Sequence, residues 1–317
     1  MQSSFFIPKY SGILWTQSLR IGIIKCIGLK KIRRLINIGN LNHINWYPGH
    51  MKKTRELIAA NLKMVDLVIE VIDARIPSSS RNPIIDELVS GKKRIIILNK
   101  SDLSDGKENE KWAEHFRQQG NMVLAMNCMT GTGVNQLYKL LNKEQEEKNS
   151  GQMRNRPLRM MIVGVPNVGK SSLINRMTGK KSAQTGDRPG VTKGKQWLAL
   201  KNGMQLLDTP GILWPKFEDP EVGLNLAFCG SIKDEIMDTA SLALELIGVL
   251  GKDYPDLLME RYKLDEILEM PLENMEEIAR KRGFILPGKK IDYERCGRTV
   301  LDEFRSGKIG KVTLERL

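Results

Sequence analysis

Short apolar runs recur along the first two thirds of the chain, each ending in a polar or glycine-rich segment. Four of them, RIIIL at 94–98, MVLAM at 122–126, LRMMIVG at 158–164 and MQLL at 204–207, have the pattern of buried strands. The stretch MKKTRELIAANLKMVDLVIEVIDAR at 51–75 is typical of an amphipathic helix followed by a further buried strand. Alternating strands and helices predict an α/β domain with a mostly parallel sheet.

Helical spacing replaces this alternation after about residue 218. Apolar residues recur at helical intervals, with few strand signals, in VGLNLAFCGSI, DTASLALELIGVL, LLMERYKL and MEEIARKRG. The pattern predicts an α/β domain over 44–218 and a smaller helical domain over 219–317. Residues 143–157, KEQEEKNSGQMRNRP, are polar without an apolar period and predict a surface linker within the α/β domain.

A phosphate-binding loop is the clearest motif. GVPNVGKS at 164–171 fits G-x-x-x-x-G-K-[ST] and lies between a predicted strand and the helix-like SLINRMTG. Backbone N–H groups at the start of that helix can surround the α- and β-phosphates of a nucleotide. The predicted phosphate-binding residues here are Asn167, Val168, Gly169, Lys170, Ser171 and Ser172. Lys170 would reach the β- and γ-phosphates and the Ser171 hydroxyl would bind Mg²⁺, whereas a glycine-rich turn carrying Lys-Ser by chance would leave the flanking pattern unexplained.

DTPG at 208–211 supplies the metal-binding carboxylate that the phosphate loop lacks. It follows the predicted strand 204–207, at the carboxyl end where open α/β sheets bind ligands. Asp208 is expected to hold Mg²⁺ and the Gly211 N–H to contact the γ-phosphate, although the same four residues also form ordinary turns. Thr192, in RPGVTKG, is the predicted second hydroxyl ligand of Mg²⁺, with Thr185 as the competing candidate.

NKSD at 99–102 follows the predicted strand 94–98 and matches a base-recognition motif. The Asp102 carboxylate can accept hydrogen bonds from N1–H and the N2 amino group of guanine, which adenine lacks, so the motif predicts guanine specificity. Asn99 would face the other edge of the base and tie neighbouring loops together, and the Lys100 stem would pack on the base. NCMTGTG at 127–133 would close over the base mainly through backbone N–H groups. The predicted guanine-binding residues are Asn99, Lys100, Ser101, Asp102, Asn127 and Cys128.

The order of these motifs is unusual. A guanine-nucleotide domain ordinarily encodes its phosphate loop first and Asn-Lys-x-Asp later, whereas NKSD at 99–102 here precedes GVPNVGKS at 164–171. The order predicts a circularly permuted GTPase that uses GTP, GDP and Mg²⁺.

The motif order, INWYPGHM at 44–51 and DARIP at 73–77 resemble the ribosome biogenesis GTPase A family, RbgA or YlqF. The resemblance implies a monomeric GTP hydrolase that binds the maturing large (50S) ribosomal subunit through rRNA and ribosomal proteins. It would promote a late assembly step and leave on GTP hydrolysis. A membrane-associated regulatory GTPase is the alternative function. A nucleoside kinase is disfavoured because it has no use for the Asp102 carboxylate.

Two further roles follow from the resemblance. Ile212, directly after DTPG, cannot orient water as the glutamine of many related GTPases does, and the family points instead to His50 as the catalytic residue. The other reading is that His50 packs or caps the N-terminal helix. Asn167 would bind K⁺ near the phosphates, or would only shape the loop by a hydrogen bond.

The formal net charge of +13 is concentrated at the two ends of the chain. Residues 1–50 hold seven Lys or Arg and no Asp or Glu, and residues 279–317 form a second basic region. Such regions favour phosphate backbones, although a solvated face is the usual reading of a charge run. The four cysteines include no Cys-x-x-Cys, which predicts free thiols in a reducing compartment, and no run of eighteen apolar residues is present. A cytoplasmic location is expected.

The segment 1–43 departs from the family pattern, being basic and apolar. It resembles a mitochondrial transit peptide or a membrane-surface helix, which would make the location mitochondrial. Our preferred interpretation is an over-extended gene start, with translation from a non-AUG codon at Leu41.

Overall fold

The computed structural model describes residues 56–317 except 57, 90, 152–154, 180–196, 208–218, 233, 235 and 236. All of these lie in one contact unit, Asn45–Leu317. A helical segment at 58–62 precedes the named elements. The α/β part comprises β1 (Leu67–Asp73), α3 (Pro83–Leu88), β2 (Lys93–Asn99), α4 (Gly106–Gln118), β3 (Met122–Ala125), α5 (Val134–Asn149), β4 (Arg159–Val163), α6 (Lys170–Thr178), β5 (Trp197–Ala199), the 3₁₀ turn η2 (Lys201–Gly203) and β6 (Gln205–Leu207).

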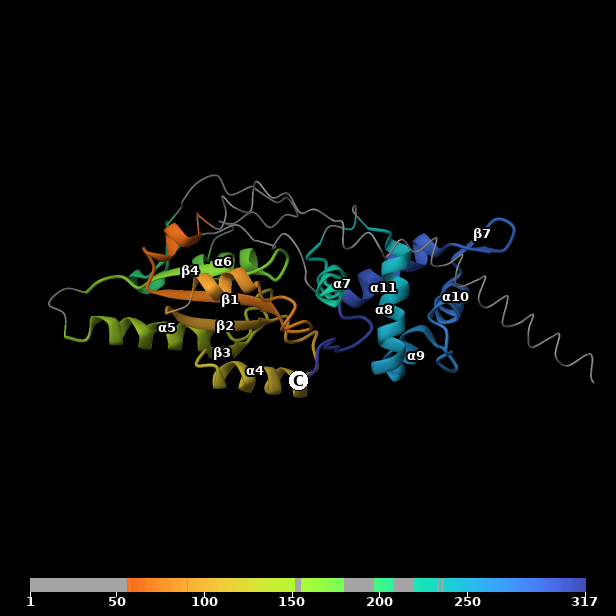
Figure 1. Ribbon diagram of the computed structural model, residues 1–317, viewed down its shortest axis with the longest axis horizontal. Helices are drawn as coiled ribbons and strands as arrows, with labels where there is room; N and C mark the ends of the chain where they lie inside the picture. Colours follow the sequence, from red (N-terminus) through yellow and green to blue (C-terminus); the bar gives the residue numbers. More distant parts are fainter. Residues whose placement is uncertain are drawn as a thin grey trace, which may run out of the picture. The chain divides into compact units, whose positions relative to one another are not determined.

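The sheet confirms the predicted mostly parallel architecture. Its strand order is β3-β2-β1-β4-β6-β5, and only β5 runs antiparallel to its neighbour. Figure 1 shows β4, β1, β2 and β3 following one another across the sheet. The pairing of β1 with β4 joins the half that carries NKSD to the half that carries the phosphate loop. The register of β1 and β2 places Asp73 beside Asn99.

Helices cover both faces of the sheet because successive side chains of each strand point to opposite sides. Leu67, Ile69 and Val71 of β1 pack in one apolar cluster with residues of α5 and α6. Val68 belongs to a second cluster with α3 and the 58–62 helix, and Ile72 to a third with α4. β1 is thus mainly apolar on both sides, as its continuous apolar run predicts, with the buried Glu70 paired to Arg94.

The prediction of a linker over 143–157 is wrong for its first half. Residues 143–149 form the last two turns of α5. Glu144 is buried there, and the Nζ of Lys93 on β2 donates to its carboxylate at 2.6 Å. This helix end is held by a long-range ion pair, which a polar sequence pattern does not reveal.

The helical C-terminal region confirms the second half of the predicted fold. It comprises α7 (Pro220–Phe228), α8 (Thr239–Asp253), α9 (Pro255–Tyr262), α10 (Pro271–Arg282) and α11 (Tyr293–Arg305), with a small hairpin of β7 (Ile285–Leu286) and β8 (Lys290–Ile291). The helix α11 was not predicted. It packs closely on α8, because a Cβ added at Gly297 of α11 would lie 2.9 Å from the Ala240 backbone of α8. Within the described residues, no helix combines the length and apolarity needed to cross a bilayer.

Candidate functional site

Four parallel strands bring the predicted motifs to one edge of the sheet. β1 ends at Asp73, β2 at Asn99, β3 at Ala125 and β4 at Val163, and the motif residues follow these ends directly. Ligands of open α/β sheets bind at this carboxyl edge. NKSD, NCMTGTG and GVPNVGKS, which are far apart in sequence, therefore converge as predicted.

Asn99 ties the three motifs together. Its Nδ2 donates to the Val168 carbonyl of the phosphate loop at 2.6 Å, and its Oδ1 accepts from the Cys128 N–H at 2.9 Å. The side chain is buried, so both bonds are shielded from water. Gly169 has a φ of 105°, and an added Cβ there would lie 2.2 Å from Asn99 Nδ2. The predicted tie between loops is confirmed, and it requires glycine at 169.

The remainder of NKSD forms a tight turn that exposes Asp102. The Leu103 N–H donates to the Lys100 carbonyl at 2.9 Å, and Lys100 has a φ of 60°. The Ser101 N–H and hydroxyl both reach the Met126 carbonyl, at 3.2 and 3.0 Å. The Asp102 side chain is exposed and makes no hydrogen bond to the described residues. Its carboxylate is therefore available for a ligand, while its neighbours are fixed.

The 127–133 loop is stabilised by its own residues. Asn127 Oδ1 accepts from the N–H groups of Met129 and Thr130 at 2.9 and 3.0 Å, which closes the turn. Cys128 is 1% exposed, and burial raises the pKa of its thiol to about 12. Its side chain is thus inert, in line with the expectation that backbone groups carry the role of this loop.

The phosphate loop lies between β4 and α6, where Gly169 precedes the first helical turn. Lys170 is 8% exposed, and its Nζ donates to the Val165 carbonyl at 2.7 Å. The ammonium group is thereby folded over the loop. The Ser171 side chain is partly exposed, and its hydroxyl makes no hydrogen bond to the described residues. Asn167 has a φ of 60°, and its Nδ2 donates to the Gly230 carbonyl of the helical region at 2.6 Å.

A buried ion network lies beneath NKSD, and two of its members, Asp73 and Arg75, are not among the predicted site residues. The Asp73 carboxylate accepts from Arg75 Nε and Nη2 at 3.0 and 2.8 Å and from Lys100 Nζ at 2.8 Å. Burial would raise the pKa of Asp73, but the charges of Arg75 and Lys100 outweigh it and hold the pKa well below its ordinary value. Lys100 thus forms an ion pair with Asp73, a role that adds to the packing on the base expected from the sequence. The sequence signal was DARIP at 73–77, in which Asp73 ends an apolar strand and Arg75 follows it.

Several predicted residues lie outside the described residues: His50, Thr185, Thr192, Asp208, Gly211 and Ile212. Asp208 follows directly after β6, which runs parallel to β4. The described residues therefore contain the guanine side and the phosphate loop but not the other expected Mg²⁺ ligands.

The comparisons with known proteins agree with this geometry. The model of a family described as 50S ribosome-binding GTPase matches residues 159–276, which include the phosphate loop but not the earlier NKSD. Ribosome biogenesis GTPase A of Bacillus cereus is 46% identical over 276 residues, covering 86% of this chain and 93% of the relative. The chain belongs to the ribosome biogenesis GTPase A family. It is therefore a guanine-nucleotide-binding GTP hydrolase.

Less similar relatives also match most of this chain. Mitochondrial ribosome-associated GTPase 1 of Mus musculus is 36% identical, covering 86% of this chain and 90% of the relative. A solved GDP-bound YlqF structure is 32% identical with a TM-score of 0.61, covering 82% of this chain and 98% of that one. The structural likeness thus extends over nearly the whole of that solved structure.

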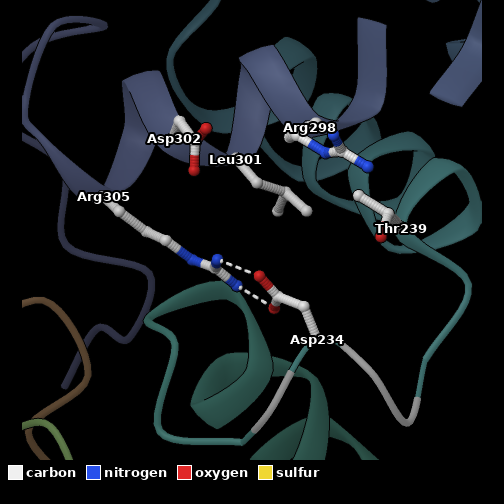
Figure 2. A pocket seen from close by; sticks show the side chains of 6 residues that line it. All are labelled: Asp234, Thr239, Arg298, Leu301, Asp302 and Arg305. Carbon is white, nitrogen blue, oxygen red and sulfur yellow. Dashed lines mark hydrogen bonds and ion pairs between the residues drawn. The ribbon is translucent and has the colours of Figure 1, made fainter. Parts of the chain in front are cut away.

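A cavity of about 310 Å³ in this family member lies in the helical region, away from the motif residues. It is lined by Asp234, Thr239, Arg298, Leu301, Asp302 and Arg305 (Figure 2). Two nitrogens of Arg305 donate to the Asp234 carboxylate at 2.7 Å each, and the same guanidinium donates to the carbonyls of Ala227 and Phe228. Arg305 thereby fastens the end of α7 to α11.

Proposed function

We propose that this GTPase binds the maturing large ribosomal subunit, promotes a late assembly step, and leaves the particle when GTP is hydrolysed. The observation that carries the proposal is the likeness, over 86% of the chain, to proteins named ribosome biogenesis GTPase A, together with a match to a 50S ribosome-binding GTPase model. The alternative of a membrane-associated regulator has no comparable support.

Guanine selection is assigned to NKSD. Asp102 is exposed at the carboxyl edge of the sheet, where it would accept from N1–H and N2 of the base. Asn99 and Lys100 are already engaged with Val168 and Asp73, so they hold the loop that presents Asp102. GDP binding to Asp102→Ala tests the assignment, since an unchanged affinity would remove Asp102 from base recognition.

Mg²⁺ and the phosphates are assigned to the start of α6 and to the segment after β6. Ser171 fits the metal because its partly exposed hydroxyl makes no hydrogen bond to the described residues. Thr192 and Asp208 are the proposed further ligands, and Gly211 the γ-phosphate contact. Bound Mg²⁺ would neutralise charge developing on the phosphate oxygens. Lys170 would exchange the Val165 carbonyl for the β- and γ-phosphates.

His50 is proposed to orient the attacking water, because Ile212 has no polar group to do so. Ribosome-stimulated turnover of His50→Ala tests this role. Turnover and GTP affinity that both equal those of the unmodified protein would exclude His50 from the mechanism.

K⁺ is proposed to bind at Asn167. The Nδ2 group of Asn167 is occupied by the Gly230 carbonyl, which leaves the Oδ1 atom as an available oxygen ligand. Hydrolysis rates in K⁺ and in Na⁺ at equal ionic strength test the site, and equal rates would refute it.

The helical region is proposed to bind rRNA, but through fewer charges than the sequence count indicates. Several basic side chains are already paired: Arg280 with Glu276 and Glu277, Lys281 with Asp265, Arg282 with Glu303, and Arg305 with Asp234. Nine exposed cations of this region have no ion pair to described residues: Lys252, Lys263, Lys289, Lys290, Arg295, Arg298, Lys308, Lys311 and Arg316. These are the charges available to phosphates.

Lys289→Ala with Lys290→Ala tests that surface, because Lys289 lies in the turn of the exposed hairpin β7–β8 and Lys290 begins β8. We expect weaker binding to precursor particles and a salt-dependence slope reduced by about 1 per lost phosphate contact. Arg280→Ala is the matched control, since its charge is neutralised within the protein.

Cosedimentation tests the proposed function as a whole. Full-length protein with a non-hydrolysable GTP analogue should sediment with large-subunit precursors and be released when GDP replaces the analogue. Equal sedimentation in both nucleotide states would refute release on hydrolysis. Binding to anionic liposomes and not to particles would favour the membrane-associated alternative.

The cellular location is proposed to be the cytoplasm, in line with the bacterial relatives, with the mitochondrion as the alternative in view of the mouse relative's name. The intact mass of the native protein distinguishes a start at Met1 from one near Leu41.

A further inference from the structure

Residues near the end of the chain return to the α/β part and bond to the segment that follows NKSD and to the segment that follows β1. The Val312 N–H donates to the Leu103 carbonyl at 3.0 Å, and the Asp105 N–H donates to Thr313 Oγ1 at 3.1 Å. The Leu314 N–H donates to the Arg75 carbonyl at 2.8 Å. Residues 312–315, called the tail below, therefore connect the segment after β1 with the segment after β2.

Glu315 completes this connection on the β1 side. Its carboxylate accepts from the N–H groups of Ser78 and Ser79 and from the Ser79 hydroxyl. Its carbonyl accepts from Trp112 Nε1 at 3.1 Å. Burial raises the pKa of Glu315, and the serine donors partly offset that rise. A carboxylate held by several donors in a buried setting has little freedom to move.

The tail is part of the packed interior. Val312 and Thr313 are each 1% exposed. The backbone of Thr313 is bonded on both sides to the Tyr254 hydroxyl of the helical region, at 2.7 and 3.1 Å. A Cβ added at Gly307 would lie 2.6 Å from Leu103 Cδ2, so the segment that follows α11 also contacts the same turn. The helical region thus reaches the residues directly after Asp102.

Asp102 depends on these neighbours for its position. It makes no hydrogen bond to the described residues, and its carboxylate is exposed. Lys100 before it is held by Asp73, and Leu103 after it is bonded to Val312. The backbone that carries Asp102 is therefore held at two points, one of which is supplied by the tail.

We propose that the tail positions Asp102 for guanine recognition, so that discrimination among bases depends on the C-terminal end of the chain. Thr313 and Val312 act as positioning residues, because they act through Leu103 and Asp105 and not on the base. The inference rests on the proposed role of Asp102 as the guanine-reading residue.

Thr313→Val in the full chain tests the inference, since it removes the Oγ1 acceptor with little change of shape. Affinities for GDP and for IDP, whose base lacks the N2 amino group, are measured together. We expect GDP binding to weaken roughly three- to tenfold, the range for one lost backbone hydrogen bond, and IDP binding to weaken less. The GDP-to-IDP affinity ratio therefore falls. Thr313→Ser should retain the ratio.

Thr299→Val is the matched control, because among the described residues that hydroxyl bonds only to the Arg295 carbonyl on α11. It should leave both affinities unchanged. Circular dichroism and the urea midpoint verify folding of each variant. If Thr313→Val does not fold, Glu315→Gln is measured in its place, since it weakens the Ser78 and Ser79 bonds from the other side of the tail.

The outcomes distinguish the role of Asp102 in reading guanine from the role of the tail in positioning Asp102. An unmodified protein that binds GDP and IDP equally would refute Asp102 as the guanine reader. Clear discrimination in the unmodified protein, with an unchanged affinity ratio in a folded tail variant, would overturn the positioning role alone. Equal weakening of GDP and IDP would also overturn it, because that result indicates a general loss of structure.

Discussion

Replacing Asp73 by Asn removes a carboxylate that holds two cations in the interior. Asp73 and Arg75 have side chains that are each 1% exposed, whereas Lys100 is 23% exposed. The variant keeps the shape of the side chain and one acceptor oxygen but loses the charge. The Arg75 guanidinium then remains buried without a counter-ion, while Lys100 can still turn toward water.

The magnitude follows from this difference in burial. Breaking a buried ion pair from one side costs about 3–5 kcal/mol, because the remaining charge is left uncompensated. Lys100 adds little to that cost, since partly exposed pairs contribute roughly 0–1 kcal/mol. We therefore expect Asp73→Asn to lower the free energy of unfolding by about 3–5 kcal/mol. The double variant Asp73→Leu with Arg75→Met should lose less than the single variant, because it leaves no buried charge at these two positions.

Urea unfolding of the nucleotide-free protein measures the effect. Asp265→Asn is the control, because Asp265 is 94% exposed and pairs with Lys281 at 3.3 Å; we expect almost no change. If the free energy of unfolding of Asp73→Asn is within about 1 kcal/mol of that of the unmodified protein, the reasoning is refuted, because so small a cost is typical of an ion pair exposed to water.

The pH dependence gives an independent check with a defined sign. The pKa of Asp73 is lower in the folded protein than the ordinary value of about 3.9. Its stabilisation is therefore fully present above that ordinary value and is lost as the pH falls through the lower, folded pKa. The stability difference between the unmodified protein and Asp73→Asn should shrink as the pH is lowered from about 5 toward 2. A difference that grows on acidification would contradict the assignment.

Two other predictions concern the motif residues. Gly169→Ala should weaken GDP binding at least about tenfold, because the new Cβ displaces Asn99 and breaks its bond to Val168. Gly179→Ala is the control, since Gly179 also has a positive φ but has no atom within 4 Å of the added Cβ. We expect this control to leave GDP affinity intact. Equal affinities in the two variants would exclude the close approach as the cause. The thiols of Cys128, Cys229 and Cys296, whose pKa burial raises to about 12, should resist alkylation at pH 8 until the protein unfolds. Rapid labelling of the folded protein at these positions would contradict their burial.

The central strands and the motifs at their ends could be predicted because both depend on local sequence. A strand buried on two faces requires an unbroken apolar run, as in RIIIL at 94–98, and loop motifs at the carboxyl ends of parallel strands must converge. Asn99 is a case where even the interaction was predictable, since its motif implies contacts to neighbouring loops. The structure adds the partners, Val168 and Cys128, and their distances.

Features that depend on distant partners could not be predicted. The end of α5 reads as a polar linker, yet Glu144 is buried against Lys93 of β2. The ion network of Asp73 and Arg75 likewise depends on Lys100 and on carbonyls of α11, at 3.5 Å from Arg75 Nη1. Charge counting had the same weakness, because the sequence does not show which basic residues of 279–317 are neutralised by nearby carboxylates.

The helical region contacts both halves of the nucleotide site, which has a thermodynamic consequence. Gly230 accepts from Asn167 in the phosphate loop, and the tail accepts from and donates to the turn after Asp102. If a partner that binds the helical region stabilises these contacts, and the contacts differ between nucleotide states, the partner changes the affinity for each nucleotide, and each nucleotide changes partner affinity by the same factor. The GDP affinity measured with and without precursor particles should therefore change by the factor by which GDP changes particle affinity. If the particle does not alter nucleotide binding, these contacts hold the fold together and carry no signal between the two sites.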